Sequence, residues 1–313
     1  MISFVVPVRS IEAESAVLDN LRPAAGMEAV IAAGSNPSAQ RNGAVKKVTG
    51  GIIYFVDDDS VVNKESILRA ERFFESRPDA YILGGPALAP VGTGFLGRVF
   101  AGTLGSVWGS GMSASRYVKR GGMREAGEKE LILCNLLVRK EVFEKAGFFR
   151  EDLYPNEENE FINRAKKHGF KAVYDPEISV ARAPRKAVSG FIKQCFRYGK
   201  GRAEQMRYGA NAGDAANIIP ALFLVYAAVT PAAALFYPAF LAPWVLYAAL
   251  NISFSAAAAL KHGRIHSFFA FFIAFPALHL SYGAGFMAGL FSGLSKKPEA
   301  AAGSITVKSV VIK

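Results

Sequence analysis

The last third of the chain contains three long segments without Asp, Glu, Lys or Arg. They are Ile218–Tyr237, Ala239–Leu260 and Ser267–Leu294. A helix of about 20 residues measures about 30 Å, which is the thickness of the hydrocarbon core of a bilayer. Buried helices of this length without any charge are uncommon in soluble proteins. The sequence therefore predicts about three transmembrane helices within residues 216–294, followed by a tail of residues 295–313.

The first residues of the chain predict which side of the membrane its N-terminal part occupies. Met1–Val8 is too short for a signal peptide and lacks a basic start, so it predicts a first strand in a cytoplasmic domain. The first span then leaves the cytoplasm and the second returns, which places Lys261 and Arg264 inside, as the positive-inside rule prefers. A third span would put Lys296 and Lys297 outside, against that rule. Either the short tail is tolerated there, or one apolar segment is re-entrant.

Residues 1–181 alternate short apolar runs with helical patterns. The expected strands are residues 4–8, 29–33, 51–56, 80–83, 131–139 and 172–174. The expected helices are residues 13–21, 40–47, 64–76, 140–146 and 157–168. This order predicts an α/β domain with a mostly parallel sheet and flanking helices. The glycine- and serine-rich stretch of residues 92–122 is either a loop with a core helix or a mobile flap.

A basic segment, residues 182–215, joins this domain to the apolar region. Between Arg182 and Arg207, eight Lys and Arg face only one acid, Glu204, and aromatic residues lie among them. This pattern predicts an amphipathic element on a membrane surface. A basic helix beside nucleic acid would explain the net charge of +11 but not the apolar third that follows. Only two cysteines occur, which indicates a reducing compartment.

Three consecutive carboxylates, Asp57, Asp58 and Asp59, follow the apolar run Gly51–Val56. Adjacent carboxylates at the end of a buried strand repel one another and require compensation. Mg²⁺ or Mn²⁺ with oxygen ligands would supply it at the carboxyl edge of a sheet, where open α/β folds bind ligands. The alternative is that these residues only cap the helix that begins at Lys64.

A second acidic cluster begins about a hundred residues later, with Glu157, Glu158 and Glu160. It is either the acidic first turn of a helix or the source of a general base. A metal site and a separate base suit the transfer of a group from a phosphorylated donor to a hydroxyl, because the metal neutralises the leaving diphosphate while the base removes the acceptor's proton.

Four short motifs occur in a specific order. They are Val5-Val6-Pro7-Val8-Arg9, Phe55-Val56-Asp57-Asp58-Asp59-Ser60, Asn156-Glu157-Glu158-Asn159-Glu160 and Gln194-Cys195-Phe196-Arg197-Tyr198-Gly199. The set resembles the membrane-anchored, inverting family-2 glycosyltransferases of GT-A fold that build bacterial exopolysaccharide. The resemblance covers residues 1 to about 210 and implies a GT-A catalytic domain in residues 1–181.

The resemblance implies a role for each motif. Asp57 and Asp59 match the DxD motif, which binds the metal and the nucleotide diphosphate. Glu158 stands at the position of the catalytic base, with Glu157 as the alternative base and Glu160 as a neighbour that orients it. The donor-binding residues would be Pro7, Val8, Arg9, Glu12, Arg41 and Asp58. The alternatives are that Arg41 only braces the acidic end of the strand and that Asp58 serves only the fold. Gln194, Arg197 and Arg202 would contact the diphosphate or the acceptor, in a variant of the QxxRW motif with Tyr198 in place of Trp.

The chain departs from the family at two further places. The acidic turn expected after the second strand is replaced by Ala32-Ala33-Gly34-Ser35-Asn36, and the base is Glu where Asp is usual. The whole pattern predicts a metal-dependent inverting glycosyltransferase at the bacterial inner membrane, which moves a sugar from a nucleotide-diphosphate donor to a lipid-linked or glycan acceptor. The alternative is a non-catalytic membrane protein that uses such a domain to bind a nucleotide or a partner.

Overall fold

The computed structural model describes residues 1–209, 212–263, 265–292 and 304–313. These residues form two compact units. The first consists of Met1–Val91, Ser115–Ala183 and Lys297–Lys313, and the second of Gly92–Ala114 and Pro184–Lys296. Arg264, Lys296 and Lys297, on which the predicted membrane topology depends, lie outside the described residues.

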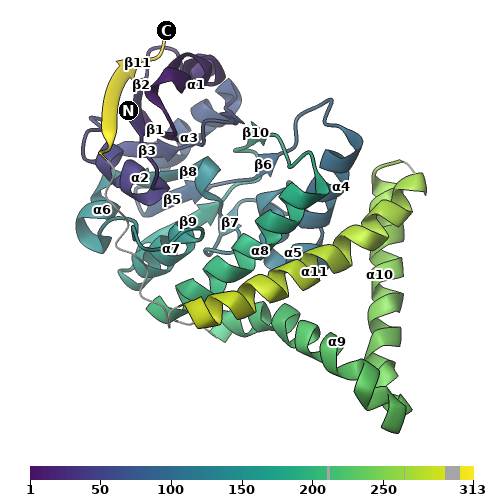
Figure 1. Ribbon diagram of the computed structural model, residues 1–313. Coiled ribbons are helices and arrows are strands. Elements are labelled where there is room, and N and C mark those ends of the chain that lie inside the picture. The colour runs from purple at the N-terminus through teal and green to yellow at the C-terminus, as the bar shows by residue number, and fades with distance from the viewer. Residues whose placement is uncertain (210–211, 264, 293–303) are drawn as a thin grey trace. The chain divides into compact units, whose positions relative to one another are not determined.

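The first unit contains a mixed sheet of eight strands in the order β11-β2-β1-β3-β8-β5-β9-β7 (Figure 1). The strands are β1 (Ile2–Val8), β2 (Glu28–Ala33), β3 (Ile52–Phe55), β5 (Ala80–Gly84), β7 (Arg124–Glu125), β8 (Leu136–Arg139), β9 (Lys171–Tyr174) and β11 (Thr306–Val311). The pairings of β1, β2, β3, β5 and β9 give these five strands one direction, and β7, β8 and β11 run against them. The mostly parallel α/β sheet predicted from the sequence is confirmed.

Helices cover both faces of this sheet. The helices of the first unit are α1 (Glu14–Leu21), α2 (Pro37–Val45), α3 (Lys64–Ser76), α6 (Lys140–Ala146) and α7 (Glu157–Lys167). On β1, Phe4 and Val6 pack with apolar residues of α1 and α3, while Val5 packs with those of α2, α6 and α7. Alternate side chains of a strand point to opposite faces, so each face has its own core.

Two strands differ from the sequence-based expectation. Of the strand expected at residues 131–139, Leu136–Arg139 forms a strand, whereas a 3-10 turn occupies Leu133–Asn135. The tail, for which the sequence predicted no strand, contains β11, which pairs antiparallel with β2 from Thr306 to Val311. Three short strands form a second sheet, in the order β4 (Ser60–Val61), β10 (Val180–Arg182) and β6 (Ala87–Leu88).

The second unit is helical. It contains α4 (Phe95–Leu104), α5 (Val107–Ser110), α8 (Val188–Gln205), α9 (Ile219–Phe236), α10 (Ala242–Lys261) and α11 (Phe268–Phe291). The stretch expected to be a loop with a core helix or a flap holds α4 and α5. Three segments are long and apolar enough to cross a membrane: Asp214–Phe236, Pro238–Lys261 and Ile265–Phe291. Figure 1 shows α9 and α10 meeting at a corner, with α11 as the third side of a triangle.

Candidate active site

The carboxylates of the Asp57–Asp59 triplet lie at the carboxyl edge of the eight-stranded sheet, immediately after β3. Edge geometry alone brings this turn near the ends of β1 and β2, because the three strands are parallel neighbours. Asp57 is partly buried, while Asp58 and Asp59 are exposed. The main-chain oxygen of Asp58 accepts a hydrogen bond from Asn20 at 3.0 Å.

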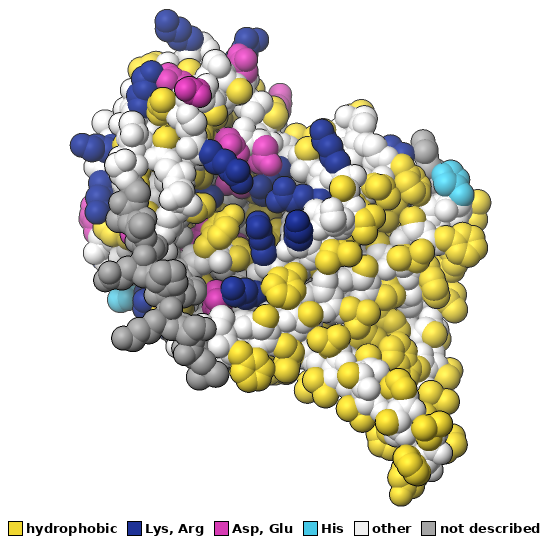
Figure 2. Space-filling view, in the orientation of Figure 1, with side chains coloured by type: hydrophobic (Ala, Val, Ile, Leu, Met, Phe, Trp, Pro, Cys, Tyr) yellow, Lys and Arg dark blue, Asp and Glu magenta, His cyan; other side chains and the backbone are white. Residues whose placement is uncertain are grey.

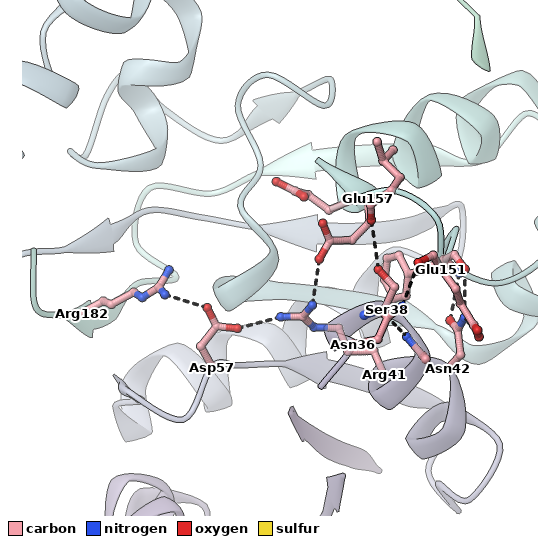
Figure 3. A network of polar contacts seen from close by, with 12 residues as sticks. Asn36, Ser38, Arg41, Asn42, Asp57, Glu151, Glu157 and Arg182 are labelled. Carbon is pink, nitrogen blue, oxygen red and sulfur yellow. Dashed lines mark hydrogen bonds and ion pairs between the residues drawn. The ribbon is translucent and has the colours of Figure 1, made fainter. Parts of the chain in front are cut away.

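Two arginines hold Asp57 from opposite sides (Figure 3). Arg41 Nη2 lies 2.8 Å from Asp57 Oδ1, and Arg182 Nη2 lies 2.9 Å from Asp57 Oδ2. Burial by itself would raise the pKa of the Asp57 carboxyl, but the charges of Arg182 and Arg41 outweigh it and lower that pKa. Asp57 is therefore ionised in the folded protein and compensated by cations of the chain.

The same arginines extend the contacts in both directions. Arg41 Nη1 donates to Glu157 Oε1 at 2.9 Å, and Arg182 Nε donates to Asp59 Oδ1 at 2.9 Å. Glu157, Arg41, Asp57, Arg182 and Asp59 thus form one chain of contacts in which carboxyl groups alternate with guanidinium groups, which we term the carboxyl–arginine network. It joins the start of α7 to the end of β3. The side chain at one end, Glu157, is 3% exposed and that at the other, Asp59, is 48% exposed, so the Asp59 end is open to solvent.

The three glutamates at the start of α7 each have their own arginine. Glu157 pairs with Arg41, Glu158 with Arg116 Nη1 at 3.4 Å, and Glu160 with Arg164 Nη2 at 2.8 Å. All three glutamates are buried. The first turn of a helix also favours negative charge, because its free N–H groups point toward it.

The pKa of Glu157 differs from that of an ordinary carboxyl. Burial raises it to about 8; the charge of Arg41 opposes this shift and the charge of Glu158 adds to it. Asn156, which precedes the helix, has a left-handed backbone (φ 84°), and its Oδ1 accepts from Asn159 Nδ2 at 2.7 Å. This turn fixes where α7 begins and hence where its acidic side chains project.

Arg116 was not identified from the sequence. Its guanidinium donates to the carbonyl of Lys129 at 2.9 Å and also contacts the carbonyl of Glu128 and the amide oxygen of Asn159. These contacts fix the cation that faces Glu158. Arg116 lies 42 positions before Glu158 in the sequence, and nothing in the local pattern marks it as its partner. Arg182 was assigned to the basic membrane segment, but it lies in β10 and contacts Asp57 and Asp59.

The remaining predicted donor residues lie along β1, after it, or on α2. Pro7 and Val8 end β1, and the main-chain oxygen of Val8 accepts from Gln40 at 2.6 Å. Arg9 and Glu12 are exposed in the turn that follows. Arg41 lies on α2 and is 5% exposed. Its Nε is buried without a hydrogen-bond partner among the described residues.

The predicted diphosphate and acceptor residues lie on α8, in the second unit. Gln194 Nε2 donates to the hydroxyl of Tyr198 at 2.8 Å. Arg197 is exposed, whereas Arg202 is buried and its Nη1 donates to Gln205 Oε1 at 3.0 Å. The carboxyl–arginine network belongs entirely to the first unit.

The residues present suit one kind of metal site. No group of three or more His, Cys, Asp or Glu side chains that could hold a metal occurs in the described part of the chain. Mg²⁺ and Mn²⁺, however, often bind one or two carboxylates and complete their coordination with substrate phosphates. Asp57 and Asp59 provide such a pair of oxygen donors beside an exposed surface.

The comparison with known families shows to which protein family this chain belongs. Residues 52–287, most of the chain, match the family described as glycosyl transferase family group 2. The chain belongs to this family. The matched range includes Asp57, Asp59, Glu158 and the helix α8 of this family-2 glycosyltransferase, and the resemblance inferred from its motifs is confirmed.

A solved structure supports the GT-A fold. A mannosyltransferase, PcManGT from Pyrobaculum calidifontis, solved in complex with GDP-Man and Mn²⁺, is 16% identical, with a TM-score of 0.55 over 93% of this chain and 87% of that one. At this identity the likeness concerns the fold alone. TarS 1–349 from S. aureus, solved with UDP-GlcNAc, is 14% identical over 92% of this chain and 90% of that one, with a TM-score of 0.44 that supports no argument. No curated protein matches the chain by sequence.

Proposed function

We propose that the chain is a metal-dependent, inverting hexosyltransferase of bacterial exopolysaccharide synthesis, attached to the inner membrane with its catalytic domain in the cytoplasm. It would move a sugar from a nucleotide-diphosphate donor to a hydroxyl of a lipid-linked or glycan acceptor. Family membership and the carboxyl–arginine network support this proposal. The network connects the acidic turn after β3 with the acidic start of α7, the two sequence motifs to which donor and base chemistry are assigned.

The donor would bind at the exposed end of the carboxyl–arginine network. Asp59 and Asp57 would hold Mg²⁺ or Mn²⁺, which when bound would neutralise charge on the donor diphosphate. Arg182 lies between the two carboxylates, so we expect its guanidinium to move toward the phosphates when a donor is bound. Arg41 offers a further N–H, the buried Nε, to a phosphate oxygen. The nearby Pro7, Val8, Arg9, Glu12 and Asp58 would contact the nucleotide.

Glu158 would act as the base. Its carboxylate would take the proton of the acceptor hydroxyl, whose oxygen forms the new bond at the anomeric carbon. The bond from that carbon to the diphosphate breaks, and the diphosphate leaves with the electron pair, which inverts the configuration. Arg116, which faces the Glu158 carboxylate, would orient it before transfer. Glu157, bound to Arg41 and with its raised pKa, is the alternative base.

The localisation rests on the apolar helices and the cysteines. Asp214–Phe236, Pro238–Lys261 and Ile265–Phe291 have the length and composition of membrane helices. Cys134 and Cys195 are both free, which suits a reducing compartment. Gln194, Arg197 and Arg202 on α8 would contact the diphosphate or the acceptor.

Sugar transfer by isolated membranes tests the assigned roles. A panel of labelled nucleotide sugars would be offered together with extracted lipid acceptors, and the variants Glu158→Gln and Asp59→Asn compared with the parent. We expect each variant to lose at least about 10²-fold in rate. Glu144→Gln, an exposed glutamate of α6, is the matched control and should keep the parent's rate.

Parent-like turnover in either site variant would contradict the role of that residue. Metal-dependent binding of a nucleotide sugar by the parent, without turnover over the whole panel, would instead favour a non-catalytic binding protein.

A further inference from the structure

The end of the chain returns to the catalytic sheet after the three apolar helices. Strand β11 pairs with β2 over six residue pairs, from Thr306 opposite Ala33 to Val311 opposite Glu28. Main-chain hydrogen bonds continue the contact: Ile312 N donates to the oxygen of Met27 at 2.9 Å, and Gly26 N donates to the oxygen of Ile312 at 2.8 Å.

Side chains also fix β11 in place. Ile312 is 1% exposed within the core that contains Phe4 and Leu21. Lys308 Nζ lies 2.6 Å from Glu14 Oε2, and Ser309 Oγ donates to Glu28 Oε1 at 2.9 Å. The C-terminal strand is therefore on the same side of any membrane as the sheet that carries the active site.

The segment between α11 and β11 is unsuited to recross a bilayer. Residues 293–303 include Lys296, Lys297, Pro298 and Glu299. A helix of this length would measure about 16 Å, roughly half of the hydrocarbon core. An extended segment would leave its backbone N–H and C=O groups without partners in lipid. The chain must therefore cross the membrane an even number of times between Ala183 and Ile305.

Of the three apolar helices, α11 has the contacts of a helix that does not cross. It runs along α8 at very short range: an added Cβ at Gly285 would lie 1.9 Å from the carbonyl oxygen of Phe196, and one at Gly289 would lie 2.5 Å from that of Lys200. Arg207 donates to the carbonyl of Leu290 at 3.0 Å. Helix α8 carries Lys193, Arg197, Lys200 and Arg202, so it cannot lie in the hydrocarbon core.

The first half of α11 packs on α4 and α5. His279 Nε2 lies 2.8 Å from the carbonyl oxygen of Trp108, and a Cβ at Gly109 would contact the ring of Phe275 at 3.4 Å. Helix α4 has only 10 residues, about 15 Å, and both ends of the segment 92–114 continue into the first unit. Helix α11 therefore lies along elements that stay on the catalytic side.

Helices α9 and α10 differ from α11 in burial. In the most apolar 18-residue stretch of the α9 segment and of the α10 segment, only 11% is buried inside the protein, against 33% in that of the α11 segment. Their exposed side chains include Leu235, Phe236, Val245 and Leu246. Residues 215–260 contain no Asp, Glu, Lys or Arg, the corner between the helices included. In Figure 2 the lower right part of the molecule, where α9 and α10 meet, shows hydrophobic side chains and no charged ones on the visible face.

We propose that α9 and α10 form a hairpin inserted into the lipid bilayer from the catalytic face, and that α11 lies along that face without crossing. The apolar region thus enters and leaves the membrane on one side, and the C-terminal strand completes the catalytic sheet there. This inference rests on the membrane attachment in the proposed function. It replaces three crossings by a hairpin, and it removes the conflict of Lys296 and Lys297 with the positive-inside rule.

Labelling with a membrane-impermeant maleimide tests this topology in the full chain. Cysteine is introduced at Lys313, the exposed C-terminal residue, or at Glu75, an exposed residue of α3 in the catalytic domain. The parent chain is the blank, because Cys134 and Cys195 are each 1% exposed. Both variants are compared in intact cells and in inverted vesicles, and carbonate extraction establishes separately that the protein is embedded.

We expect Lys313→Cys and Glu75→Cys to react in the same preparation and to be protected in the other. Opposite labelling of the two sites would overturn the proposal, because it requires an odd number of crossings. Release of the protein by carbonate would overturn insertion of the hairpin. The labelling does not depend on sugar transfer, so loss of the proposed enzymatic function would leave this test intact.

Discussion

Arg182 Nε donates to the Asp59 carboxylate at 2.9 Å, although the two residues are separated by 123 positions in the sequence. The same guanidinium contacts Asp57, so one cation of the chain lies between the two carboxylates proposed to bind a divalent metal. Metal and Arg182 would therefore compete for the same negative charge before a donor arrives.

Removing this cation should strengthen metal binding in the absence of nucleotide. We expect Arg182→Gln to bind Mn²⁺ about three- to tenfold more tightly than the parent, because the partly exposed ion pairs to be replaced are worth about 1 kcal/mol. Electron paramagnetic resonance of free Mn²⁺ measures the affinity. Arg69→Gln, which removes an arginine paired with Asp175, is the control and should bind as the parent does. Unchanged or weaker binding by Arg182→Gln would show that Arg182 does not compete with metal.

The raised pKa of Glu157 predicts a pH dependence of stability. Because burial raises this pKa from 4.5 to about 8, the folded state holds a proton that the unfolded state releases. The resulting stabilisation is complete below pH 4.5 and is lost as the pH rises through about 8. Relative to Glu157→Gln, the parent should therefore lose several degrees in its unfolding midpoint between pH 5 and pH 9, at about 2–4 °C per kcal/mol. Thermal unfolding in detergent provides the measurement.

The exposed glutamate of α6 supplies the comparison for that experiment. Glu144→Gln should follow the parent at every pH. If Glu157→Gln shows the same pH dependence as the parent, Glu157 is not the group that titrates.

Two adjacent residues at the C-terminus test the pairing of β11. Ile312 is 1% exposed and Val311 is 66% exposed. We expect Ile312→Ala to lower the free energy of unfolding by about 2–5 kcal/mol, since it removes buried methylene groups from the core. Val311→Ala should change it by less than about 0.5 kcal/mol. Equal effects of the two substitutions on chemical denaturation would argue against a docked C-terminal strand.

The contact between α8 and α11 depends on the absence of a side chain at Gly285. A Cβ there would collide with the carbonyl oxygen of Phe196, so Gly285→Val must separate the two helices. We expect a loss of more than about 2 kcal/mol in stability, measured as faster proteolysis of the second unit in detergent. Ala288→Val, on the exposed side of α11, is the matched control and should be digested at the parent's rate.

Much of the fold could be predicted because the pattern of each element is local. The helices at Lys64–Ser76 and Lys140–Ala146 have the bounds expected from periodicity and from Gly147, whose positive φ (81°) ends the second one. The strands β1, β2, β3 and β5 follow from short apolar runs. Strand β11 could not be predicted in the same way, because an isolated strand is unstable and forms only where another strand, here β2, offers an unpaired edge.

In the candidate site, too, the features defined by local sequence could be predicted and those defined by tertiary packing could not. The sequence by itself determined that acidic residues follow β3 and begin α7, since both positions are defined by neighbouring residues. Only the tertiary structure decided which cations face them. Arg41 reaches Glu157 across 116 positions, and Arg116 and Arg182 come from segments whose local patterns indicated other roles. Ion pairs form through space between charges of opposite sign, and their partners are fixed only when the sheet and its helices have packed.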